Sequence, residues 1–428
     1  MRLFILIVAA TLLTSSCQRG APPAPAPSAA PAPWPLAVSA LPSPAAGQSL
    51  APQLTTYAGG AILSWLEQRD GTTTLRFAER VQPGWGSPVT VASGRNWFVS
   101  YADVPSVVRK ADGTLVANWL VETDASIEAY DLLLSYSRDN GVTWAAPFSP
   151  HHDGTRTQHG FASFFELPGN ALGLVWLDGR QQELDTTSPE GGAMSLRSAT
   201  FDAAWKQTAD AAVDVRVCEC CPTTAAVTSS GVITAFRDRS DGDVRDIRVS
   251  TMENGTWQSG PLVHEDGWVI AACPVNGPML AARGQTVAVA WFTAKDDQGH
   301  AYAAFSTDAG RTWGPPNRLD DATALGHVDI ELLPDGSAAA TWVEFAGQRA
   351  QVKVRRIEPG GAKSPAVTVS GAGDGRPTGV PRLAVAGDEL LLAWTENAVP
   401  WNGTDGAAGS RQQIKTAAAR VPRATAIR

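Results

Sequence analysis

The stretch Ser137-Arg138-Asp139-Asn140-Gly141-Val142-Thr143-Trp144 follows the pattern S-x-D-x-G-x-T-W, and Ser306-Thr307-Asp308-Ala309-Gly310-Arg311-Thr312-Trp313 follows it again. The aspartate of such a segment can accept backbone N–H groups within a tight turn, and the glycine supplies a backbone angle that other residues resist. We expect the tryptophan to pack between adjacent sheets. The predicted structural residues are Ser137, Asp139, Gly141, Thr143, Trp144, Ser306, Asp308, Gly310, Thr312 and Trp313.

A longer repeat surrounds these turns. In each copy an apolar run ends in an aromatic residue, often with an acid two places later, as in Ile62-Leu63-Ser64-Trp65-Leu66-Glu67. Seven copies lie 51 to 60 residues apart, with their aromatic residues at Trp65, Trp119, Trp176, Phe236, Trp291, Trp342 and Trp394. An apolar strand precedes each copy and an alternating strand follows it, which gives four short strands per period. We therefore predict an all-β fold, a β-propeller of seven four-stranded blades, with six blades as the alternative.

The S-x-D-x-G-x-T-W segments resemble the Asp-box, or BNR, repeat of the sialidase superfamily. That resemblance implies a propeller and a ligand site at the top of its central channel. Active sialidases also carry an Arg-Ile-Pro motif, a Tyr nucleophile activated by Glu, and an Asp acid/base. Here the nearest match is Ala102-Asp103-Val104-Pro105, in which Asp103 stands where the Arg belongs. Whether the chain is an enzyme therefore stays open; if it is one, the resemblance implies a sialidase-like glycoside hydrolase.

The ends of the repeat region predict how the ring closes. The last repeat has a third strand at residues 413–421 and no room for a fourth. The segment Trp34-Pro35-Leu36-Ala37-Val38-Ser39 fits the spacing of an outer strand. We expect this segment to complete the last blade and remove its exposed edge. The predicted propeller domain spans residues 33–422, followed by a tail at 423–428.

The N-terminus has the pattern of an export signal. Arg2 precedes an apolar run from Leu3 to Leu13, and Thr14-Ser15-Ser16-Cys17 follows. This resembles the lipobox of bacterial lipoproteins, which implies lipidation of Cys17 after removal of the signal; a plain signal peptide cut nearby is the alternative. Gln18 after the cysteine implies the outer membrane. We predict a lipoprotein signal at residues 1–17, an Ala/Pro-rich tether at 18–32, and a protein anchored in the cell envelope by its lipid alone.

Composition limits the partners. The formal net charge is −8 and there is no long basic run, so nucleic acid is not expected. No segment after the signal approaches the length of a membrane helix. We expect a monomer whose partner is a glycan, a peptide or another envelope protein.

Candidate site residues appear when the starts of the innermost strands are aligned by counting back from each inner aromatic residue. We expect these residues to meet around the channel mouth. They are Tyr101, His159, Cys218, Cys220, Cys221, Cys273, His327 and Arg376. The four cysteines allow two interpretations: disulfides, as is usual in an exported protein, or a zinc or copper site shared with the histidines.

The ends of the second strands should lie on the same face. Charged residues there include Asp178 and Arg180, and an alternating run begins at Arg237. The members of that run are Arg237, Asp238, Arg239, Asp241, Asp243, Arg245, Asp246 and Arg248. Arginine binds carboxylates in a bidentate way, which favours an anionic or sugar ligand; a self-paired, solvated loop is the alternative.

Three functions stay open from the sequence. The first is a binding propeller with ligand contacts from Tyr101, His159, Arg180, Arg237, Arg239, Arg245, His327 and Arg376. The second is an exo-α-sialidase-type hydrolase, with catalytic candidates Asp103, Arg180, Arg237, Asp238 and Arg245. The third is a metal-binding or redox-linked envelope protein that uses the Cys/His residues.

Overall fold

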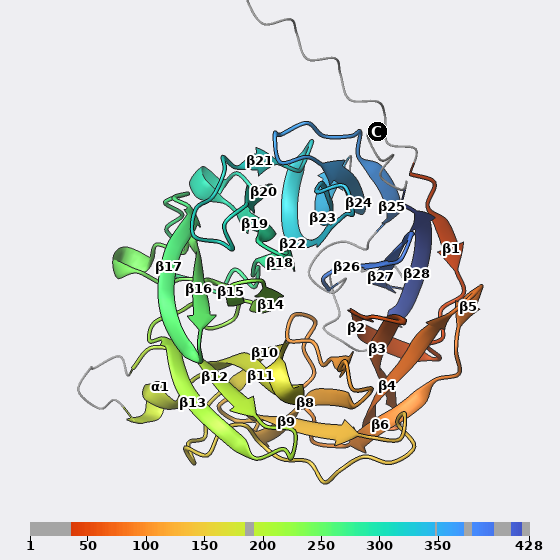
Figure 1. Cartoon of the computed structure of the whole chain (residues 1–428), viewed down its shortest axis with the longest axis vertical. Coiled ribbons are helices and arrows are strands. Elements are labelled where there is room, and N and C mark those ends of the chain that lie inside the picture. Colours follow the sequence, from red (N-terminus) through yellow and green to blue (C-terminus); the bar gives the residue numbers. More distant parts are fainter. Residues whose placement is uncertain (1–35, 185–191, 347–348, 372–378, 398–411, 422–428) are drawn as a thin grey trace, which may run out of the picture.

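The computed structural model describes residues 36–184, 192–346, 349–371, 379–397 and 412–421. Seven sheets stand around a central axis as the blades of a propeller, and the chain visits them in sequence order (Figure 1). Within the described residues the only α-helix is the short α1 (Arg180–Leu184), beside 3-10 turns at Pro168–Asn170, Asp241–Asp243 and Lys295–Asp297. None of the helices described is long and apolar enough to cross a membrane. The all-β, seven-bladed prediction is confirmed.

Each blade is an antiparallel meander whose first strand lies nearest the axis. Blades 1 to 3 are β2 (Gln48–Tyr57), β3 (Gly60–Arg69), β4 (Thr72–Val81), β5 (Gly84–Trp85) and β6 (Val89–Gly94); β7 (Val107–Arg109), β8 (Leu115–Asp124) and β9 (Ala129–Ser137); β10 (His159–Leu167), β11 (Ala171–Asp178), β12 (Ser195–Phe201) and β13 (Gln207–Asp214). Blades 4 and 5 are β14 (Thr224–Thr228), β15 (Gly231–Arg237), β16 (Ile247–Glu253) and β17 (Thr256–His264); β18 (Met279–Arg283), β19 (Thr286–Thr293), β20 (His300–Ser306) and β21 (Asn317–Arg318). Blades 6 and 7 are β22 (Thr323–Leu332), β23 (Ala338–Ala346), β24 (Arg349–Ile357) and β25 (Val367–Gly371); β26 (Arg382–Ala386), β27 (Glu389–Asn397), β28 (Gln412–Arg420) and β1 (Ser39–Leu41).

The N-terminal strand closes the ring as expected. Strand β1 pairs antiparallel with β28, so the two ends of the chain share blade 7. The strand starts at Ser39, later than the predicted start at Trp34, which lies outside the described residues. The pairing covers the edge that β28 would otherwise expose to solvent.

The repeated aromatic residues lie in the second strand of every blade and are buried. Trp65 packs with Leu391 of β27 in a cluster that joins blades 1 and 7. The acid two places later also has a role, because the indole N–H of Trp65 donates to Glu67 at 2.9 Å. The same bond joins Trp176 to Asp178 at 2.9 Å and Trp342 to Glu344 at 2.8 Å. The aromatic–acid pattern is thus explained by satisfaction of a buried donor.

The two S-x-D-x-G-x-T-W turns have the same hydrogen bonds. Asp139 accepts the Ser137 hydroxyl at 2.7 Å, the Thr143 amide at 2.9 Å and the Thr143 hydroxyl at 2.6 Å. Gly141 adopts φ 84°, where a side chain would be strained. The second turn repeats this arrangement around Asp308. Hydrogen bonds from the threonine lower the pKa of both aspartates to about 2. Each carboxylate is therefore occupied by its own turn.

Candidate functional site

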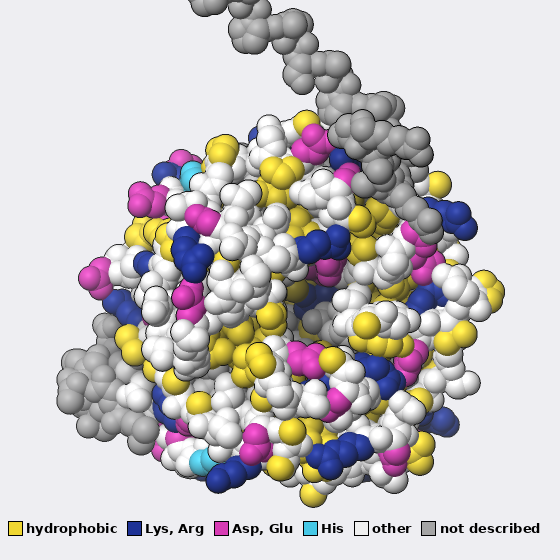
Figure 2. All heavy atoms as spheres, in the orientation of Figure 1, with side chains coloured by type: hydrophobic (Ala, Val, Ile, Leu, Met, Phe, Trp, Pro, Cys, Tyr) yellow, Lys and Arg dark blue, Asp and Glu magenta, His cyan; other side chains and the backbone are white. Residues whose placement is uncertain are grey.

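The structure divides the predicted constellation into three groups on the face where the innermost strands begin. Tyr101 and His327 lie at the channel mouth, the cysteines lie beside blade 4, and His159 lies between blades 2 and 3. One face of the molecule is hollowed at its centre, with apolar and charged side chains around the hollow (Figure 2). The structure does not bring the thiols and imidazoles into one cluster: among the described residues, His159 contacts Asp131, Asp153 and His151 rather than a cysteine.

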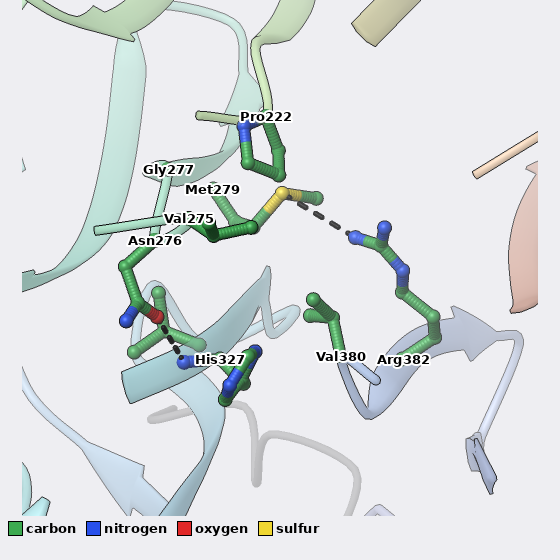
Figure 3. Close-up of a pocket in the computed structure, with 9 residues that line it drawn as sticks. Pro222, Val275, Asn276, Gly277, Met279, His327, Val380 and Arg382 are labelled. Atoms are coloured by element: carbon green, nitrogen blue, oxygen red, sulfur yellow. Dashed lines mark hydrogen bonds between the residues drawn. The ribbon is translucent and has the colours of Figure 1, made fainter. Parts of the chain in front are cut away.

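The channel mouth contains a narrow hollow of about 10 Å³, which has room for about one water molecule. Its walls are mostly apolar, and its polar groups come from Asn276, His327 and Arg382 (Figure 3). The rings of Tyr101 and His327 meet edge to face with centroids 6.2 Å apart, so the connection between blades 1 and 2 contacts the inner strand of blade 6 at the mouth. The Asn276 side chain accepts the His327 amide at 2.8 Å and so fixes the histidine backbone.

Arg382 is a buried cation at this mouth that has few hydrogen-bond partners among the described residues. Its side chain points to the sulfur of Met279, 3.5 Å away, and its Nε has no hydrogen-bond partner among the described residues (Figure 3). Burial lowers the pKa of Arg382 from its usual range, and the charge of Asp329 offsets only part of that effect. A buried guanidinium with unused donors can bind an anion or a carbonyl oxygen that enters the hollow.

Strained backbone gathers around the same axis. Ala51, Phe161, Val275, His327 and Gly379 all have φ between 53° and 64°. Each lies 14 to 16 residues before the inner aromatic of its blade, so five blades turn the chain in the same way near the mouth. For Phe and Val this conformation is costly and persists only where the surroundings impose it. Such strain is typical of ligand-binding positions.

Two carboxyls lie below the mouth on strand β22. Asp329 accepts the backbone N–H groups of Ile330 and Leu383, each at 2.8 Å. Burial raises the pKa of Asp329 to about 6. Burial also raises the pKa of Glu331 to about 8, and the charge of Asp329 adds to the effect. The inner strand of blade 6 thus holds two protonatable groups near neutral pH.

The four predicted thiols form a cluster next to the mouth. The sulfur atoms of Cys218 and Cys221 are 3.0 Å apart, and those of Cys218 and Cys220 are 4.0 Å apart. Cys273 interacts with Cys220. All four are free cysteines in the structure, so neither expected arrangement, disulfides or metal, is decided. Hydrogen bonds from its neighbouring thiols lower the pKa of Cys218.

The arginines beside the thiols form hydrogen bonds and ion pairs with other groups of the protein. Arg237 is 1% exposed and donates to the carbonyls of Asn276, Phe292 and Arg245. Arg245 donates to Cys218 at 3.2 Å and to Glu219 at 2.9 Å, and Arg239 also contacts Glu219. Asp238 accepts Arg248 at 3.0 Å. These bonds fit the self-paired loop, and Arg237 in particular uses four of its five N–H donors on backbone carbonyls of the protein.

The catalytic residues implied by the resemblance to sialidases find little support in Asp103 and in the tyrosine–glutamate pair of the structure. Asp103 is 2% exposed and accepts the Phe161 amide at 2.8 Å, so it packs between blades 2 and 3. Burial raises the pKa of Asp103 to about 7. A Tyr/Glu pair does exist, because Tyr57 donates to Glu79 at 2.7 Å. It lies at the opposite end of β2 from the mouth, and burial raises the pKa of Tyr57, which disfavours a nucleophilic role.

His159 and Arg180 belong to a cluster of their own. His159 is fully buried and its ring stacks on His151 with centroids 3.8 Å apart. Burial opposes protonation of His159, but the hydrogen bond with Asp153 and the charge of Asp178 raise its pKa. Arg180 pairs with Asp178 at 2.7 Å and with Asp153 at 3.3 Å.

Some predicted residues cannot be placed and some important ones were missed. Arg376 and Cys17, like the predicted signal, tether and tail, lie outside the described residues. Arg382, which was not predicted, lines the mouth. The counting rule missed His151 and Asp153 because they lie in the connection between blades. The run His151-His152-Asp153, shortly before His159, was the available signal.

Comparison with known proteins supports the fold. No protein-family description matches the chain, and no curated protein matches it. Among solved structures, polysaccharide lyase Uly1 resembles the chain with a TM-score of 0.51 at 10% identity, covering 86% of this chain and 89% of that one. The α-L-arabinofuranosidase Arb93A from Fusarium graminearum gives a TM-score of 0.48 at 13% identity, covering 91% and 98%. A NanB sialidase mutant from Streptococcus pneumoniae gives 0.45 at 10% identity, covering 84% and 83%.

At these identities the likeness defines a class, the β-propeller shared with Uly1, and nothing finer. The β-propeller fold implied by the turn motifs is confirmed. What the chain binds or catalyses has to be argued from its own site.

Proposed function

We propose that the protein binds a glycan at the channel mouth through Tyr101, His327 and Arg382. The observation that supports this proposal most directly is the contact of the Tyr101 ring with His327. His327 lines a mostly apolar hollow that also contains the buried guanidinium of Arg382, whose Nε has no hydrogen-bond partner among the described residues. Binding sites for small ligands are typically apolar concavities with a few convergent polar groups. Positive φ angles in five blades around this mouth, four of them at non-glycine residues, support the same location.

The residue types indicate a sugar that carries a carboxylate. Tyr offers an apolar ring face with a polar tip, which suits the mixed surface of a sugar ring. A guanidinium binds carboxylates through two parallel N–H donors. Uly1, which shares the fold, is a polysaccharide lyase, and we therefore choose oligosaccharides as the first ligands to test.

The test is calorimetric titration of the purified protein with matched neutral and acidic oligosaccharides. We expect H327A to weaken binding of both, and R382Q to weaken binding of the acidic sugars by at least about tenfold, because a hydrogen bond to a charged group is lost. H300A is the control, since His300 is half-buried on blade 5 and pairs with Asp320. Unchanged affinity in H327A and R382Q would refute the proposal.

The thiol cluster supports a second candidate, the metal-binding or redox-linked function. The sulfur atoms of Cys218, Cys220 and Cys221 lie within 4.8 Å of one another, a spacing that thiolate ligands of zinc or copper adopt. Elemental analysis and thiol counting on one sample separate the alternatives. Stoichiometric metal lost in C218S would support the second candidate. Two closed disulfides without metal would instead mean that the cluster is a covalent cross-link between the chain segments that lead into blades 4 and 5.

We also propose that the chain is exported and held in the outer membrane by a lipid on Cys17. The support is the N-terminal sequence alone, with its apolar run and small residues before the cysteine. Labelling of growing cells with a fatty-acid probe is expected to mark the wild type and not C17S. Wild-type protein that is exported but unlabelled would favour a plain signal peptide.

A further inference from the structure

A group of histidines and aspartates lies away from the channel mouth, between blades 2 and 3. Asp131 belongs to β9, His159 begins β10, and His151 and Asp153 lie in the chain that joins these strands. Both imidazoles are enclosed, with side chains 5% and 0% exposed, whereas Asp131 is 37% exposed. The arrangement has a buried side of two rings and an open side at Asp131.

One edge of the stacked ring pair faces Asp131. The Oδ1 atom of Asp131 lies 3.9 Å from His151 Nε2 and 3.7 Å from His159 Nδ1. Both nitrogens are buried and lack a hydrogen-bond partner among the described residues. Leaving buried polar atoms without partners costs free energy, so a further group on this edge would be stabilising. His159 Nε2 on the opposite edge also lacks a hydrogen-bond partner, but it faces the carboxylate of Asp153.

The opposite edge of both rings faces a single carboxylate. Asp153 Oδ2 lies 3.5 Å from His151 Nδ1 and 3.3 Å from His159 Nε2. A carboxylate on this edge favours N–H at these nitrogens, so the lone pairs point to the Asp131 edge. A shared carboxylate behind two imidazoles is the arrangement that orients histidine ligands of metal ions. Arg180, 3.3 Å from the same Asp153 oxygen, keeps this edge unsuitable for a cation.

The distances from Asp131 Oδ1 to the two imidazole nitrogens suit a bridging metal ion better than a direct hydrogen bond. They exceed the roughly 2.7–3.2 Å of a hydrogen bond. Ligand atoms bound at about 2.0–2.2 Å around a tetrahedral ion are about 3.4 Å apart, so contraction by a few tenths of an ångström would suffice. Because the rings are stacked at an interplanar angle of 3°, binding also requires them to tilt apart.

The geometry points to a divalent transition-metal site formed by Asp131, His151 and His159, with Asp153 as the orienting carboxylate. Two imidazoles and one carboxylate are a ligand set that zinc accepts. A hollow of about 490 Å³ adjoins the site and is lined by Asp131, His151 and the exposed His152. It leaves a coordination position open to water or another small ligand.

The experiment uses purified protein whose thiols are first blocked with iodoacetamide, because the cysteines would otherwise compete for metal. After EDTA treatment and its removal, zinc chloride is titrated by calorimetry and bound zinc is counted by elemental analysis. We expect about one zinc per chain, and an affinity reduced by at least about tenfold in D131N and H151Q. The matched control is H152Q, which changes the neighbouring histidine on the same hollow and should bind zinc as the wild type does.

Two results would overturn the site: thiol-blocked wild type that binds no zinc, or D131N that binds zinc as tightly as H152Q. D131N keeps the inference testable if H151Q fails to fold, because Asp131 is partly exposed and the change is conservative. Glycan binding at the mouth should be unaffected in D131N, so this test and that of the proposed function fail separately.

Discussion

Ser39 and Ala418 face each other as partners in the antiparallel pair of β1 and β28, and this contact joins the two ends of the propeller. Thr416 reinforces it by donating its hydroxyl to the Leu41 carbonyl at 3.1 Å. The ring therefore depends on a strand of three residues.

Removing that strand should open the ring. A chain lacking residues 1–41 is expected to lose about 2–4 kcal/mol of unfolding free energy, since each ladder hydrogen bond contributes about 0.5–1.5 kcal/mol. It should also self-associate through the exposed edge of β28. Urea unfolding and light scattering measure both effects. A chain lacking only residues 1–35 is the control, and equal stability of the two would contradict the closure role.

The turn aspartates should make the fold sensitive to acid. Asp139 and Asp308 have folded-state pKa values of about 2, below the ordinary value of 3.8. Their contribution is present above the ordinary pKa and is lost as pH falls through about 2. The double variant D139N/D308N should be less stable than wild type at pH 7, with a shallower loss between pH 4 and 2. Urea unfolding across this range tests it, with D296N on an exposed loop as control.

Glu331 should act in the opposite direction. Its folded-state pKa of about 8 lies above the ordinary value, so its contribution is full in acid and is lost as pH rises through about 8. We expect E331Q to be more stable than wild type at pH 9, by roughly 1–3 kcal/mol, and close to it at pH 5. Thermal unfolding of E331Q and wild type at the two pH values tests this prediction. A stability difference that does not change with pH would mean that Glu331 stays in one protonation state.

Arg237 should prove structural. Replacing it with Lys leaves the carbonyls of Asn276, Phe292 and Arg245 without a planar donor, in a buried site beside Trp268. We expect R237K to lose about 3–5 kcal/mol of unfolding free energy. R239Q is the control, because Arg239 is 27% exposed and pairs near the surface. A stable R237K that loses only glycan affinity would restore Arg237 as a ligand-binding residue.

Part of the site could be predicted, because the spacing of the repeat determines which residues start each blade. The spacing does not determine which side chains become neighbours. Counting back from Trp119 and Trp342 found Tyr101 and His327, which do meet at the mouth. The same counting chose Arg376, which lies outside the described residues, and it did not find Arg382, which lines the hollow. Bulges such as the register shift between Gly326 and Asp329 alter which residue faces the axis, and a bulge leaves no periodic trace.

The sequence by itself determined the seven blades, their inner aromatic residues and the closing N-terminal strand, because strand period and turn chemistry are local and repeat along the chain. Only the tertiary structure decided that His159 joins Asp131 and His151 rather than the cysteines, and that Arg237 is spent on backbone carbonyls. Such pairings depend on the route of irregular connections between blades, where no repeat constrains which side chains meet.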